Sequence, residues 1–112
     1  MKVVGIGDLF IPSQYIKTGF EPYEKQYGLT VETLEWKLKG FDELQNVNLL
    51  VEQSGAEAFE VPDYIVEAVK DADVIVTQFC PVNKKVIDAC KNLKYVGVLR
   101  AGYENVNAKY AE

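Results

Sequence analysis

Four short apolar runs divide the chain and predict four β-strands. They cover residues 3–7, 29–36, 74–79 and 94–99. Three of these runs are apolar almost throughout, which is typical of strands that are buried on both faces of a parallel sheet. The run at 29–36 alternates its apolar residues with polar ones, so we expect it to have one polar face and to lie nearer an edge of the sheet.

Segments with apolar residues at helical spacing lie between these runs and predict helices. The first extends from Ser13 to Tyr27, and we expect a kink or two short helices there because Gly19 and Pro22 interrupt the pattern. Gly28 follows, and glycine is suited to the left-handed turn that ends many helices.

Three further helices are predicted at residues 41–53, 64–69 and 84–91. Asp42 is a candidate N-cap for the first of them, with Gln45 at the spacing of a capping box. Pro62 precedes the second and can open a helix. Asn107 is a candidate N-cap for one more helix that begins at the end of the chain.

This alternation of strands and helices predicts an α/β fold, with a mostly parallel sheet covered by helices on both faces. Right-handed crossovers favour a flavodoxin-like, doubly wound sheet with the strand order 2-1-3-4, and we treat residues 1–112 as a single domain. A fifth strand of such a sheet is missing from the pattern. We therefore expect the fourth strand to present an open edge, which can pair with a second copy of the chain.

Composition narrows the range of partners. The net charge is −5 and no basic cluster is present, which argues against nucleic acid and anionic membrane surfaces as partners. The longest apolar runs are far shorter than a membrane span. Because the chain enters a strand directly after Met1, we expect no signal peptide. Because nothing suggests a disulfide framework, we expect a reducing, cytoplasmic location.

The chain has no histidine, which excludes Ser–His and Cys–His catalysis and the usual zinc sites within these residues. We therefore expect no metal site. The only two cysteines, Cys80 and Cys90, do not form a disulfide framework.

Three features near the predicted strand ends suggest chemistry but have simpler structural explanations. The run from Gly5 to Gly7 begins like a dinucleotide-binding fingerprint, but Phe10 stands where the third glycine belongs, so we interpret these glycines as serving turn geometry. Asp8 suggests a phospho-acceptor, yet no carboxylate accompanies it on the third strand, and we interpret it as a loop carboxylate. Cys80 has no histidine to activate it, so we expect it to be a small buried apolar residue.

The strongest candidate site follows the fourth strand. Gly102 lets the backbone turn and lets another molecule approach the main chain closely. Consecutive exposed N–H groups at such a turn form a nest for an anion, and Arg100 adds a guanidinium that can bind a carboxylate. The alternative is that Arg100 only pairs with Glu104 on the surface, where an ion pair contributes little.

Three segments resemble the D-isomer-specific 2-hydroxyacid dehydrogenase family, which includes phosphoglycerate dehydrogenase-like enzymes. They are the strand at 72–76, the helix and strand at 81–97, and the turn at 100–107. The turn, with the sequence R-A-G-Y-E-N-V-N, is similar to the family's R-G-G-x-x-N-V-D. Asn107 stands where many relatives have aspartate.

The resemblance implies the N-terminal part of a flavodoxin-like substrate-binding domain, which in the family packs against a Rossmann domain that holds NAD or NADP. Carried over by motif, the amides of Ala101 and Gly102 would hold the carboxylate of a small 2-hydroxy or 2-oxo acid, with Arg100 beside them. No residue matches the family's catalytic arginine, glutamate and histidine, and the G-x-G-x-x-G loop is absent. We therefore expect this chain to bind no cofactor and to be inactive alone.

A second interpretation treats the chain as a free-standing flavodoxin-like binding or interaction module. Such a module would form a homodimer through the open edge of its fourth strand.

Overall fold

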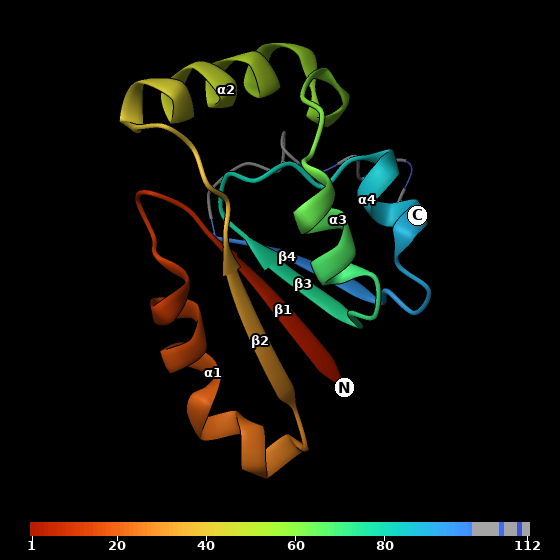
Figure 1. Cartoon of the computed structure of the whole chain (residues 1–112). Coiled ribbons are helices and arrows are strands. Elements are labelled where there is room, and N and C mark those ends of the chain that lie inside the picture. Colours follow the sequence, from red (N-terminus) through yellow and green to blue (C-terminus); the bar gives the residue numbers. More distant parts are fainter. Residues whose placement is uncertain (100–105, 107–109, 111–112) are drawn as a thin grey trace.

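The computed structural model describes residues 1–99 together with Val106 and Tyr110. It has one sheet of four parallel strands in the order β2-β1-β3-β4, with helices on both faces (Figure 1). The strands are β1 (Lys2–Gly7), β2 (Thr30–Glu35), β3 (Val74–Thr77) and β4 (Tyr95–Val98), and the helices are α1 (Ser13–Tyr27), α2 (Phe41–Ser54), α3 (Asp63–Val69) and α4 (Lys84–Ala89), with a short 3-10 turn η1 (Ala56–Ala58) after α2. The predicted α/β fold and strand order are confirmed. The turn η1 was not predicted.

The sheet has β1 near its centre and β2 at one edge. Gly5 of β1 lies opposite Thr33 of β2 on one side and opposite Val76 of β3 on the other. β1 is buried along almost all its length, whereas β2 is exposed at alternate positions near its start, as the sequence predicted for an edge strand. β4 pairs with the far side of β3.

The two glycines of β1 allow α1 to lie close to the sheet. A Cβ atom at Gly5 would lie 2.6 Å from Cγ2 of Ile16, and one at Gly7 would lie 2.3 Å from the backbone nitrogen of Ser13. Neither glycine has a positive φ angle. The interpretation that they serve turn geometry is therefore wrong, because they are needed for close approach between the strand and the helix.

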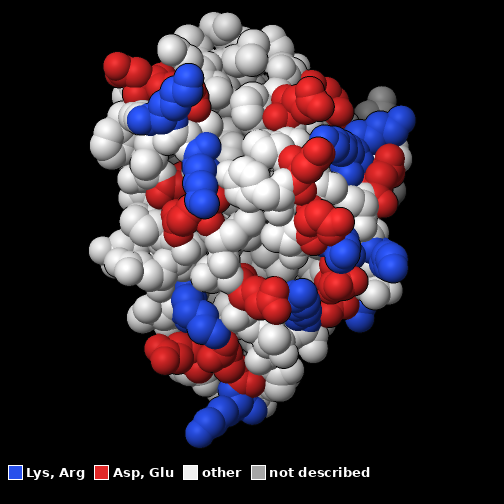
Figure 2. All heavy atoms as spheres, viewed as in Figure 1, with Lys and Arg blue, Asp and Glu red and all other residues white. Residues whose placement is uncertain are grey.

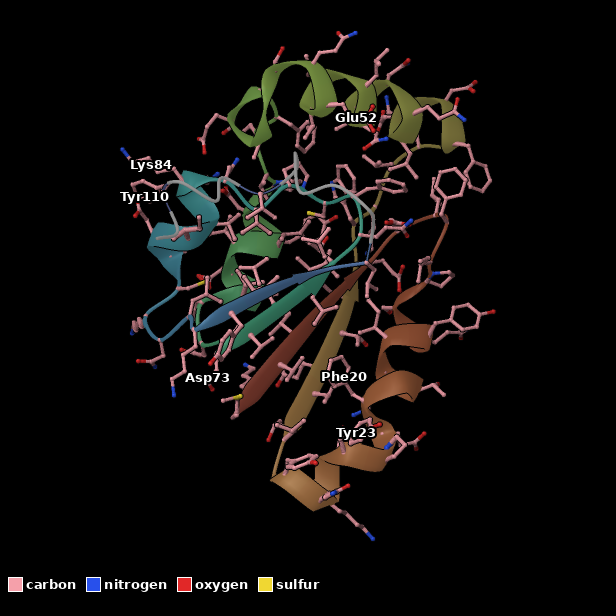
Figure 3. The ribbon with its side chains drawn as sticks, turned by 180° about the vertical axis from the view of Figure 1, so that it is seen from behind. Phe20, Tyr23, Glu52, Asp73, Lys84 and Tyr110 are labelled. Carbon is pink, nitrogen blue, oxygen red and sulfur yellow. The ribbon has the colours of Figure 1, made fainter. Side chains whose placement is uncertain are left out.

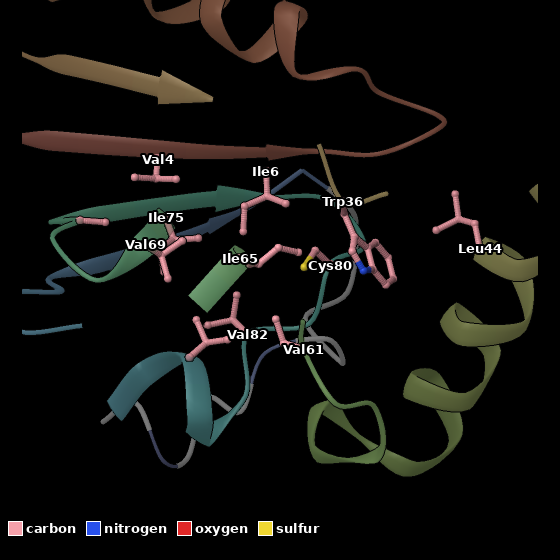
Figure 4. Close-up of a cluster of buried hydrophobic side chains, with 12 residues drawn as sticks. Val4, Ile6, Trp36, Leu44, Val61, Ile65, Val69, Ile75, Cys80 and Val82 are labelled. Atoms are coloured by element: carbon pink, nitrogen blue, oxygen red, sulfur yellow. The ribbon is translucent and has the colours of Figure 1, made fainter. Parts of the chain in front are cut away.

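The larger core lies between the sheet and helices α2, α3 and α4 (Figure 4). Its buried members are Val4, Ile6, Trp36, Leu44, Val61, Ile65, Val69, Ala72, Ile75, Cys80, Val82 and Val86. Trp36 and Cys80 lie toward the α2 end of this cluster, beyond the strands, while Val4 and Ile75 lie deeper under the sheet. Burial of this many apolar side chains is the main source of stability for the fold.

Among the described helices, only α1 covers the other face of the sheet, where Val3, Ile16, Val31 and Val76 form a smaller core. This helix packs on β1 and β2, so Tyr95 of β4 and the neighbouring Leu99 stay exposed. The expectation that residues 94–99 are buried on both faces is therefore wrong for this part of the chain. An apolar groove of about 300 Å³ lies between α1 and the end of β4.

The helix α1 forms one element and contains Pro22 in its interior. It does not split into two helices, and Figure 1 shows that its second half bends away from the axis of its first half, as expected for an internal proline. Gly28 ends it with φ of 65°, which confirms the predicted left-handed terminus.

The helix α2 begins at Phe41, as predicted, but the predicted N-cap Asp42 is wrong. Gly40 occupies the N-cap position and no side chain caps the helix, so Asp42 lies inside the first turn. An acidic residue there still interacts favourably with the helix dipole. At α4, by contrast, Asn83 caps the helix through Oδ1, which accepts a 3.2 Å hydrogen bond from the backbone N–H of Val86.

Tyr110 lies beside α4 (Figure 3). Its hydroxyl bonds to Asp88, and the ammonium of Lys84 lies 5.3 Å from the centre of its ring. In the part of the chain that the structure describes, no helix is both long enough and apolar enough to cross a membrane.

Candidate functional site

The four parallel strands place their carboxyl ends at one edge of the sheet, the edge from which the chain leaves toward α2 (Figure 1). Ligands of open α/β sheets bind outside this edge, among the segments that follow the strands. Here these segments begin at Asp8, Trp36 and Gln78, and the fourth begins at Leu99, whose N–H donates a 2.8 Å hydrogen bond to the carbonyl of Thr77.

The predicted site residues Arg100, Ala101 and Gly102 lie outside the described residues, as do Glu104 and Asn107. The described residues on either side of this stretch are Leu99, at the end of β4, and Val106. Val106 forms a parallel bridge with Val82, which follows β3, and it packs against the larger core. The predicted turn is therefore joined in sequence, on both sides, to residues at the carboxyl edge.

Asp8 organises the loop that follows β1. Its side chain is 3% exposed, and Oδ1 accepts hydrogen bonds from the N–H groups of Phe10 and Ile11 at 2.8 and 2.9 Å. The N–H of Asp8 donates to the carbonyl of Ile11 at 3.0 Å, so the loop closes on itself. The second oxygen, Oδ2, is buried and accepts no hydrogen bond from the described part of the chain.

Sequence reasoning placed Asp8 in a loop but missed its burial and its role. The available signal was an aspartate directly after a buried strand, which commonly accepts hydrogen bonds from N–H groups two and three residues later.

Trp36 occupies the equivalent place after β2. Its backbone N–H donates a 2.8 Å hydrogen bond to the carbonyl of Gly7, which extends the pairing of β1 and β2 by one step. The indole is 1% exposed and meets the ring of Phe59 edge-on at 5.5 Å. Its Nε1–H is buried and donates no hydrogen bond to any residue that the structure describes.

Cys80 lies two residues after Gln78 in the sequence and is fully buried. Burial raises the pKa of its thiol far above the ordinary value, and the nearby charge of Asp8 raises it further. A thiol that stays protonated is a poor nucleophile. The interpretation of Cys80 as a small buried apolar residue is confirmed.

The loop after β1 does not fit the phosphates of a dinucleotide. Such phosphates need free backbone N–H groups at the start of the following helix. In this loop an internal carboxylate, Asp8, takes the N–H groups of Phe10 and Ile11, and Glu35 takes that of Ser13 at 2.8 Å. The carboxylates already occupy the positions that an anionic ligand would need.

A group of aromatic side chains lies at the same edge and was not predicted. We call Phe10, Phe41 and Phe79 the edge aromatic cluster. The ring of Phe10 lies 5.1 Å from that of Phe41 and 5.8 Å from that of Phe79. Phe10 is 49% exposed and Phe41 is 53% exposed, whereas Phe79 is partly buried and packs against the larger core.

The described residues contain no group of three or more histidine, cysteine, aspartate or glutamate side chains that could hold a metal ion.

Comparisons with known proteins agree with one another. A family model described as the D-isomer specific 2-hydroxyacid dehydrogenase catalytic domain matches residues 30–112. The hydroxypyruvate reductase of Blautia hydrogenotrophica is 30% identical over 86 residues, which make up 77% of this chain and 25% of that protein. The crystal structure of the NAD⁺-bound 3-phosphoglycerate dehydrogenase of Entamoeba histolytica superposes with a TM-score of 0.66 at 19% identity, over 98% of this chain and 29% of that one.

The chain thus spans about a quarter of the length of the curated relative that it matches. At 19% identity, the likeness to the solved structure concerns the fold.

Proposed function

The chain belongs to the D-isomer specific 2-hydroxyacid dehydrogenase family, and we propose that it is the N-terminal segment of the substrate-binding domain of an NAD(P)-dependent D-2-hydroxyacid dehydrogenase. The observation that carries this proposal is the family match over residues 30–112, on a sheet whose four strands have the order 2-1-3-4. The curated relative is much longer than this chain. We therefore assign the catalytic arginine, glutamate and histidine of the family to the remainder of a longer parent protein.

In this proposal Arg100, Ala101 and Gly102 hold the carboxylate of a small 2-hydroxy or 2-oxo acid. The N–H groups of Ala101 and Gly102 donate to the carboxylate, and the guanidinium of Arg100 neutralises its charge. The support is that these residues lie in sequence between Leu99 and Val106, both of which lie at the carboxyl edge. Two fixed points of attachment orient C2 of the acid for the reaction.

NAD or NADP supplies the hydride in the parent enzyme. The E. histolytica relative is NAD⁺-bound, which favours NAD. The loop after β1 has its N–H groups occupied by Asp8 and Glu35, so we assign the cofactor to a domain outside this chain. The 112-residue chain by itself is then inactive.

Substitution of Arg100 by alanine in the full-length parent tests the binding role. We expect the KM for the 2-oxo acid to rise about 10- to 100-fold, as for loss of a charged hydrogen bond, while the Kd for NADH stays unchanged. Steady-state rates of NADH oxidation and fluorescence titration with NADH measure the two quantities.

Lys94→Ala is the matched control, since Lys94 is an exposed cation at the opposite end of the same strand. An Arg100→Ala variant whose KM matches that of Lys94→Ala would contradict the proposed role of the turn.

A second candidate is a free-standing module that dimerises through β4. The observation in its favour is that β4 pairs only with β3 among the described residues and that residues 95–99 carry no charge to discourage further pairing. Light scattering on the 112-residue chain tests it: a dimer at micromolar concentration is expected, and a stable monomer would refute it.

A further inference from the structure

We draw no further inference here: the strongest candidate, the apolar groove of about 300 Å³ that lies between α1 and the end of β4 and is lined by Tyr15, Gly19 and Leu99, carries nothing because nothing in the structure shows what covers it, and acidic and basic side chains intermingle on the face shown in Figure 2, so the described residues of that face offer no charged patch as an alternative.

Discussion

Asp8 shows how one side chain can decide what a loop does. The sequence around it begins like a nucleotide-binding fingerprint, and the large residue Phe10 was enough to predict that the fingerprint is incomplete. The physical reason became visible only in the structure, where the carboxylate occupies the backbone N–H groups of its own loop. Burial of a polar atom depends on what packs over it, and a single sequence does not contain that information.

The thiol of Cys90 gives a prediction at the same scale. Burial raises the pKa of the Cys90 thiol to about 11, and its sulfur donates to the carbonyls of Val69 and Val86. The folded state therefore favours the protonated thiol. Its contribution to stability is complete below pH 9, the pH near which the thiol of the unfolded chain ionises. This contribution is lost as the pH rises from 9 to 11.

Urea unfolding of the 112-residue chain at pH 8, 9 and 10.5 measures this loss. We expect the free energy of unfolding to fall more steeply above pH 9 in the wild type than in Cys90→Ala, because both proteins share the ionisation of tyrosine and lysine and differ only in this thiol. Identical slopes for the two proteins would contradict the assignment.

At the scale of elements, β1 and α1 illustrate a contact that requires glycine. A Cβ at Gly7 would meet the backbone of Ser13, which cannot move aside, so Gly7→Ala is expected to cost about 3 kcal/mol of stability or more. Gly19 lies inside α1 with no atom within 4 Å of an added Cβ. Gly19→Ala is therefore expected to stabilise the chain by about 0.5–1 kcal/mol.

Urea unfolding of both variants against the wild type measures the two effects. The opposite signs are the diagnostic feature, because both changes are glycine to alanine. A Gly7→Ala variant as stable as the wild type would mean that α1 does not lie against β1 as described.

The strands and their order were predictable because apolar runs of this kind and right-handed crossovers leave few alternatives. The burial of β4 was not predictable from its own residues, since it depends on how far the helix layer extends over the sheet. The start of α2 at Phe41 was predicted correctly, but its cap was not, because Gly40 occupies the N-cap position and no side chain caps the helix. The edge aromatic cluster joins residues 10, 41 and 79, a meeting of distant segments that only the fold reveals.

At the scale of the whole molecule, the chain has a substantial core on one face of its sheet and a partly covered surface on the other. It spans about a quarter of the curated relative and 29% of the solved dehydrogenase. The family was predictable from the tandem of motifs at 81–97 and 100–107, and the match over residues 30–112 confirmed it. The site residues Arg100, Ala101 and Gly102 remain a prediction, because they lie outside the described residues.

We propose that these 112 residues serve a longer dehydrogenase by holding its substrate. The most direct test is to detect the polypeptide in its source cells with an antibody against this segment, and to assay the purified species for NADH-dependent reduction of 2-oxo acids. We expect a species longer by at least one domain, on the order of 150–200 residues, that reduces these acids, while the 112-residue chain alone does not. A native species of 112 residues, or turnover by that chain alone, would refute the proposed function.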